Sequence, residues 1–119
     1  MNLARAAAAI DRHYARPLTI AALACEAGAT PWHFIRAFRA TFGTTPHQRL
    51  RDRRMARARE LLITTPMPIT EIADHVGFQS LGSFSRTFRA MTGDSPVEYR
   101  RKHRRSRPIP GCFVRMYRA

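Results

Sequence analysis

The sequence predicts an all-α fold of about seven helices, with two helix-turn-helix subdomains joined by a long central helix. Three observations predict it. Apolar residues recur at helical spacing, and no segment alternates in the way that a half-buried β-strand requires. The stretches 20–46 and 69–96 have similar sequences, and the stretch 46–64 reads as one helix. Two copies joined by a helix indicate paired modules, since a solenoid would need three or more copies.

The first two helices are delimited by capping residues and a glycine. We expect the first helix over 2–15, where Asn2 is an N-cap and an apolar stripe follows at helical spacing. A short helix is expected over 20–27, with Thr19 as its N-cap. Gly28 follows it, in a left-handed conformation that glycine adopts at little cost.

A Thr-Pro pair, which is a cap followed by proline at the first helical position, opens each of the next two helices, over 31–42 and 46–64. In the helix 31–42, Phe34 and Phe38 would face the core. The central helix has apolar residues on one side. Its other side carries the arginines Arg49, Arg51, Arg53, Arg54, Arg57 and Arg59. These arginines would repel one another unless something anionic lies nearby; a simple solvated face is the alternative.

The second copy repeats the first at an offset of 49 residues before its turn and 50 after it. It has a short helix over 69–76, and Gly77 lies in the turn. A capped helix follows, in which Phe84 and Phe88 would face the core. A Ser-Pro pair then opens a last helix, which we expect to end near residue 105.

These elements divide the chain into four parts. We expect a first helix-turn-helix subdomain over 1–45, a linker helix over 46–64, a second subdomain over 65–105 and a flexible tail over 106–119. The tail contains proline and shows no helical periodicity. An apolar docking patch is the alternative interpretation of the tail.

The charge of the chain favours a polyanionic partner. There are 21 Lys and Arg residues against 8 Asp and Glu residues, which gives a net charge of +13. A genome rich in G and C would explain arginine in place of lysine, but it would not explain the shortage of acids. No apolar run approaches the roughly 20 residues that span a bilayer, so we expect no membrane partner and a cytoplasmic protein.

Each copy has the order short helix, glycine turn, second helix, which is the helix-turn-helix pattern. The second helix would then place its N-terminal half in a major groove of DNA. Trp32 could cover a sugar or a thymine methyl group, and Arg36 and Arg86 could make forked contacts to guanine or phosphate. Alternatively, Trp32 is partly core and both arginines are ordinary surface charges. The outward residues are Trp32, His33, Arg36 and Arg39 in the first copy and Ser83, Ser85, Arg86 and Arg89 in the second.

Four segments resemble the AraC/XylS family of bacterial transcription regulators: ARARELL (56–62), ITEIADHVGF (69–78), FSRTFR (84–89) and G-x-S-P-x-x-Y-R (93–100). The resemblance covers the chain from residue 17 to about 101. It implies two homeodomain-like helix-turn-helix units that bind successive major-groove segments on one face of double-stranded DNA. It also implies an activator of transcription, with RNA polymerase as a partner.

The resemblance implies specific DNA-reading positions, and some of them carry unusual residues. The implied readers are Trp32, Ile35 and Arg36 in the first unit and Leu81, Gly82, Ser83 and Arg86 in the second. Other members often have polar side chains at Ile35, Leu81 and Gly82. Ile35 could still meet a thymine methyl group, whereas Gly82 has no side chain to read with. We therefore expect the second unit to depend mainly on phosphate contacts and Arg86.

Many members of the family carry a further effector-binding or dimerisation domain before the DNA-binding part. This chain resembles the short stand-alone members, which act as monomers on DNA. An excised C-terminal domain is the alternative.

Two other classes of function are weaker interpretations. A basic binder of RNA or compact DNA without sequence choice would not need the repeated Gly, Phe and Pro positions. An enzyme or redox sensor is disfavoured because no catalytic set, paired carboxylates or metal cluster stands out, so we expect no catalysis, metal or cofactor. Cys25 is expected to be a small core residue, and a redox pair of Cys25 with Cys112 is the alternative.

Overall fold

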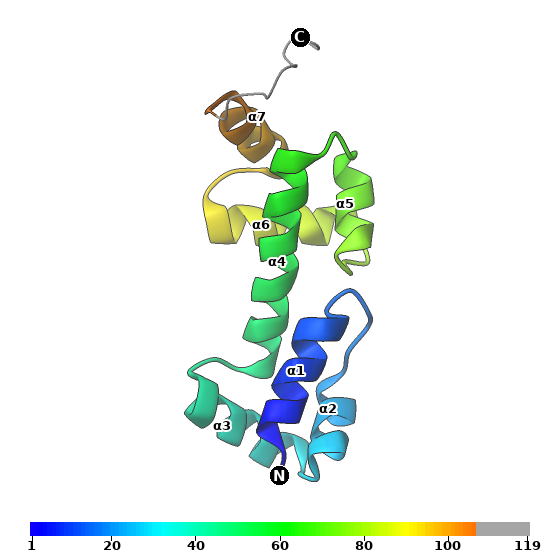
Figure 1. Cartoon of the computed structure of the whole chain (residues 1–119), viewed down its shortest axis with the longest axis vertical. Coiled ribbons are helices and arrows are strands. Elements are labelled where there is room, and N and C mark those ends of the chain that lie inside the picture. Colours follow the sequence, from blue (N-terminus) through cyan, green and yellow to red (C-terminus); the bar gives the residue numbers. More distant parts are fainter. Residues whose placement is uncertain (107–119) are drawn as a thin grey trace.

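The computed structural model describes residues 1–106, which form seven α-helices and no strand (Figure 1). The helices are α1 (Leu3–His13), α2 (Ile20–Ala27), α3 (Pro31–Phe42), α4 (Pro46–Thr64), α5 (Ile69–His75), α6 (Leu81–Thr92) and α7 (Pro96–Ser106). The all-α prediction is confirmed, although α1 ends two residues earlier than expected. The predicted tail lies outside the described residues, apart from Ser106 at the end of α7.

The helix starts follow the capping residues in the sequence. The side-chain oxygens of Asn2, Thr19, Thr30 and Ser80 each accept a hydrogen bond from the backbone N–H three residues later. At the start of α4, Thr45 and Gln48 form a reciprocal capping box. These bonds satisfy backbone N–H groups that a helix leaves without a partner in its first turn.

Two separate hydrophobic cores lie at the two ends of α4. The first core is formed by α1, α2, α3 and the start of α4, and it ends at Leu50. The second is formed by the rest of α4, α5 and α6, with Tyr99 of α7 packed against it, and it begins at Met55. We call the helices around these cores the first unit and the second unit. In Figure 1 the units lie one below the other, and α4 runs through both.

Several arginines of the central helix bind other parts of the protein. Arg49 and Arg53 both form ion pairs with Asp11 of α1. Arg54 donates to backbone carbonyls that follow α1, and Arg57 pairs with Glu60 one turn away. A uniformly solvated arginine face is therefore the wrong description of α4, because Arg49, Arg53 and Arg54 are bound to α1 or to the segment after it.

The carboxylate of Asp11 joins α1 to α4 and should make stability depend on pH. The hydrogen bond from Arg49 is the main cause that lowers the pKa of Asp11 from 3.8 to about 2, and Arg53 adds to it. The stabilisation is therefore complete above pH 3.8 and is lost as the pH falls towards 2. Because the pair is partly exposed, we expect Asp11→Asn to lower the free energy of unfolding by about 1 kcal/mol at pH 7.

Denaturant unfolding at pH 7 and at pH 2 measures this effect. The difference between Asp11→Asn and the wild type should shrink at the lower pH. Asp52→Asn is the matched control, because Asp52 is exposed and its oxygen lies 3.9 Å from Arg51. A difference that is equally large at both pH values would show that the ion pair is not its source.

The prediction that Cys25 is a core residue is wrong, because its side chain is exposed. The short helix α2 buries only the stripe formed by Leu23, Ala24 and Ala27, and Cys25 lies off that stripe beside the exposed Glu26. Cys112 lies outside the described residues, so the suggested redox pair is not addressed by the structure. Among residues 1–106, none of the helices has both the length and the apolar character needed to cross a membrane.

Candidate nucleic-acid interface

The helices α3 and α6 present equivalent faces in the two units. Phe34 and Phe38 of α3 are fully buried, as are Phe84 and Phe88 of α6. Every residue from Phe34 to Pro46 has the same degree of burial as its counterpart 50 positions later. The sequence repeat is therefore also a repeat of packing, and each unit leaves the same side of its second helix accessible.

At the start of α3, three predicted site residues form one exposed cluster. The indole of Trp32 is 61% exposed, which excludes the alternative that it is partly core. The guanidinium of Arg36 lies over the Trp32 ring, 4.7 Å from its centroid. The ring of His33 meets the same indole edge to face, at 5.1 Å between centroids. Stacking restricts the arginine side chain while its N–H groups stay available for a ligand.

At the start of α6, Arg86 occupies the place equivalent to Arg36. A Cβ atom added to Gly82 would lie 3.3 Å from Nη1 of Arg86, so the arginine extends back along the helix over the glycine. The space beside Gly82 is therefore occupied by the end of the Arg86 side chain, which the sequence did not reveal. Leu81 begins the helix beside this pair and is 43% exposed.

The remaining predicted site residues differ in how far their side chains are exposed. Arg39 and Arg89 are exposed on the next turn of their helices. Ile35, Ser83 and Ser85 are half-buried, so less of their side chains is available to a ligand. The structure thus brings Trp32, His33 and Arg36 together in the first unit. In the second unit, the equivalent arginine lies on α6 beside Gly82.

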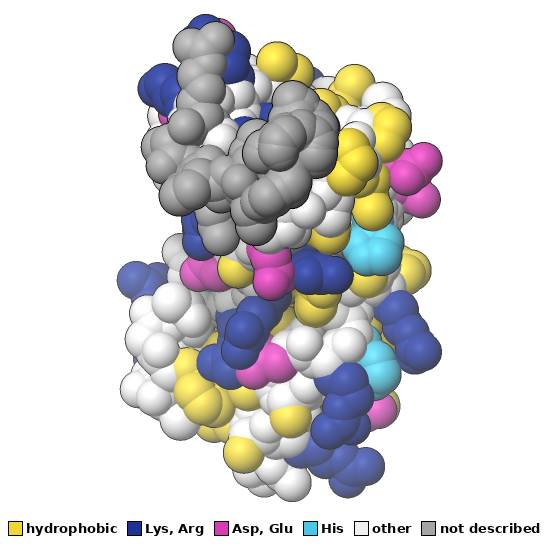
Figure 2. Space-filling view, turned by 45° about the horizontal axis from the view of Figure 1, so that its top comes forward, with side chains coloured by type: hydrophobic (Ala, Val, Ile, Leu, Met, Phe, Trp, Pro, Cys, Tyr) yellow, Lys and Arg dark blue, Asp and Glu magenta, His cyan; other side chains and the backbone are white. Residues whose placement is uncertain are grey.

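The exposed arginines of α3 and α6 differ from Arg49, Arg53 and Arg57 of α4, which form ion pairs with acidic side chains. Arg36, Arg39, Arg86 and Arg89 form no ion pair with an acidic side chain of residues 1–106. Figure 2 shows that Lys and Arg side chains cover more of one face of the molecule than Asp and Glu side chains do, as the net charge of +13 leads one to expect. Positive charge without an internal partner attracts phosphate, and arginine also matches the guanine edge in the major groove.

Arg54 is a residue whose role the sequence analysis missed. It lies between Leu50 and Ala58 at intervals of four residues, on the buried stripe of α4. Its guanidinium is half-buried, and this burial lowers its pKa. This spacing could have predicted the burial of Arg54, because an arginine on an apolar stripe is expected to find hydrogen-bond acceptors inside the fold. Within residues 1–106, no cluster of three or more His, Cys, Asp or Glu side chains could hold a metal ion.

Comparison with known proteins agrees with this architecture. A family model described as a helix-turn-helix domain matches residues 23–102. The regulatory protein SoxS of Escherichia coli K12 is 37% identical over 93 residues, which are 78% of this chain and 87% of SoxS. Other curated relatives are longer, and the chain spans between 27% and 36% of the length of three of them.

Two solved structures have the same fold as this chain. The DNA-binding domain of the global transcriptional factor AdpA, in complex with a target DNA, matches with a TM-score of 0.84 and 33% identity, covering 89% of this chain and 96% of that one. A probable AraC family transcriptional regulator from Rhodopseudomonas palustris matches with a TM-score of 0.75 and 30% identity, covering 86% and 96%. The chain belongs to the AraC/XylS family of helix-turn-helix transcription regulators.

Proposed function

We propose that this chain is a sequence-specific regulator of transcription that binds double-stranded DNA and places α3 and α6 in two successive major-groove segments. The observation that carries this proposal is the pair of equivalent helix faces, each with arginines that have no acidic partner among residues 1–106. A generic basic surface would not need this match in burial between two units.

The proposal gives the predicted residues different tasks. Arg36 and Arg86 read bases, and Trp32 packs on a sugar or a thymine methyl group while it braces Arg36. Arg39 and Arg89, one turn farther along, contact phosphates and set the depth of each helix in its groove. The half-buried Ile35, Ser83 and Ser85 make smaller contacts, together with His33, Leu81 and the backbone of Gly82.

The wider role rests on family membership. The AdpA domain was solved on a target DNA, and SoxS is named a regulatory protein. By analogy with these relatives, we propose that the chain is an activator that recruits RNA polymerase and acts at the bacterial nucleoid in the cytoplasm. We also propose that residues 1–45 and 65–105 are distinct subdomains joined by the linker 46–64, and that one chain occupies one DNA site without catalysis.

Selection of bound duplexes from random DNA tests the proposal. We expect a two-part motif whose halves are centred about 10 base pairs apart, since two helices on one face of B-DNA meet the major groove once per turn. Affinity for the selected duplex should exceed that for a shuffled duplex by at least about 10³-fold. Recovery of no motif would contradict the proposal and would support a basic binder without sequence choice.

A further inference from the structure

The two units touch directly where the turn between α5 and α6 meets the segment that follows α1. Gly77 in this turn has φ of +101°, and a Cβ atom added there would lie 3.0 Å from the carbonyl oxygen of Tyr14. The same atom would lie 3.1 Å from both Cα and the carbonyl oxygen of Ala15. Backbone therefore packs on backbone, and only a residue without a side chain permits this approach.

Arg54 of α4 binds the same segment that follows α1. Its Nε–H donates to the carbonyl oxygen of Tyr14 at 2.7 Å, and its Nη2 donates to the carbonyl oxygen of Arg16 at 3.1 Å. Its guanidinium also lies 5.7 Å from the ring centroid of Phe78, which follows Gly77. One side chain thus contacts the end of the first unit and the turn of the second.

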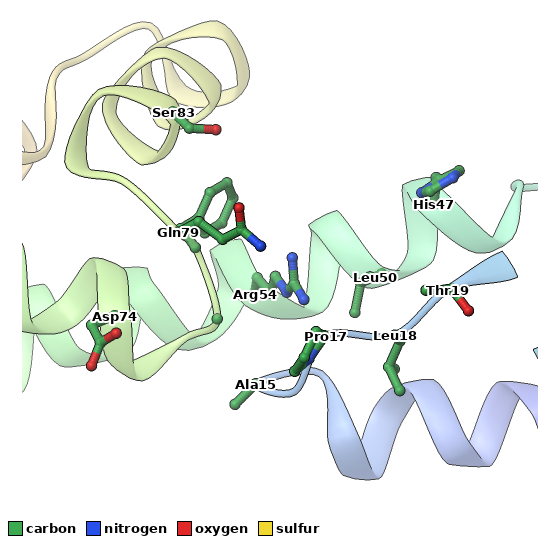
Figure 3. A pocket seen from close by; sticks show the side chains of 12 residues that line it. Ala15, Pro17, Leu18, Thr19, His47, Leu50, Arg54, Asp74, Gln79 and Ser83 are labelled. Carbon is green, nitrogen blue, oxygen red and sulfur yellow. The ribbon is translucent and has the colours of Figure 1, made fainter. Parts of the chain in front are cut away.

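This contact has little support around it. The first core ends at Leu50 and the second begins at Met55, so Arg54 lies on the stretch of α4 between them. Beside the contact, residues of both units line an open cleft of about 590 Å³. Figure 3 shows Arg54 between Pro17 of the first unit and Gln79 of the second. Because the two cores share no residue, α4 and this contact are what connect the two units here.

We propose that Arg54 and Gly77 are positioning residues that fix the angle and distance between α3 and α6, and thereby set the number of base pairs between the two half-sites. The proposal rests on the function proposed above. One base pair moves a half-site by about 3.4 Å and turns it by about 35°, so small changes in the angle between the units matter. We call the contact of Arg54 and Gly77 with the segment after α1 the clamp. A protein whose clamp is loosened should accept more spacings between the half-sites and bind each of these duplexes less tightly.

The first test measures the clamp without DNA. Spin labels are attached to the native exposed Cys25 in the first unit and to Met91→Cys on α6, with Cys112→Ser to remove the other thiol. Pulsed electron resonance should give one narrow distance distribution for this labelled protein. Arg54→Gln and Gly77→Ala should broaden it at least about twofold in width.

Two matched variants separate the clamp from ordinary effects. Arg51→Gln removes the same charge from an exposed position of α4 and should leave the distribution narrow. Gly28→Ala introduces the same change at the equivalent turn, where φ is +79° but an added Cβ meets nothing within 4 Å. It should cost stability and leave the distance between the units unchanged. A narrow, unshifted distribution in folded Arg54→Gln would overturn the proposal.

The second test uses the duplex selected by the wild-type protein, with one base pair inserted or removed between its half-sites. Wild type should lose at least about tenfold in affinity for either altered duplex, whereas Arg54→Gln should lose less than about threefold relative to its own binding of the original. An unchanged spacing penalty in Arg54→Gln, with the selected motif still preferred, would contradict the clamp alone. If no motif is selected, the proposed function fails, and the DNA-free distances still decide the clamp.

Discussion

Phe38→Ala should lower the free energy of unfolding of the first unit by about 3–5 kcal/mol, the usual cost of emptying a fully buried aromatic site. The Phe38 side chain has no exposed surface, and its ring packs against Phe34 and Phe42 at 5.7 and 4.6 Å between centroids. Truncation removes both ring contacts and leaves a cavity in the first core. This loss is a large fraction of the stability of a small domain.

Because the two cores share no residue, the damage should stay in the first unit. Amide hydrogen exchange in Phe38→Ala should show protection lost in α1, α2 and α3 and largely kept in α5 and α6. Thr41→Ala, an exposed change on the same helix, should shift stability by less than about 0.5 kcal/mol. Equal loss of protection in both units would show that they unfold as one body.

Arg36→Ala and Arg86→Ala should each weaken binding of the selected duplex by about 1–3 kcal/mol, which is roughly 5- to 150-fold. Both guanidiniums are exposed at the N-terminal half of a helix that we place in the major groove, and neither pairs with an acid of residues 1–106. A contact to a specific base exists only in the complex with the selected duplex, so its loss weakens that complex alone. Affinity for a shuffled duplex should therefore fall much less.

Titrations of the selected and shuffled duplexes measure this difference. Arg39→Ala and Arg89→Ala remove the same charge from the positions that we propose to contact phosphates, and they should weaken both duplexes by a similar factor. Arg51→Ala on α4 should change neither appreciably. If Arg36→Ala and Arg86→Ala weaken both duplexes equally, these arginines bind phosphate, and the assignment of base readers is incorrect.

Local signals predicted the helices well because capping and periodicity act within a few residues. Asn2, Thr19 and Ser80 begin helices as expected, and the repeat predicted that α3 and α6 would bury equivalent phenylalanines. Cys25 was misplaced because apolar neighbours in sequence do not decide which narrow stripe of a short helix is buried.

The contacts between distant segments could not be predicted in the same way. The position of Arg54 on the apolar stripe of α4 indicates burial, but its acceptors, the carbonyls of Tyr14 and Arg16, are 40 and 38 residues away in sequence. Gly77 is recognisable as a turn residue, whereas its approach to Ala15 depends on how the two units meet. Likewise, the space that Gly82 leaves for Arg86 depends on the direction of that side chain.

A crystal structure of the full chain on the selected duplex tests the central claim most directly. It should show the N-terminal halves of α3 and α6 in two successive major-groove segments on one face of the DNA, with Arg36 and Arg86 within hydrogen-bonding distance of base edges. A complex in which only one helix enters a groove, or in which both lie outside the grooves against the backbone, would contradict the account.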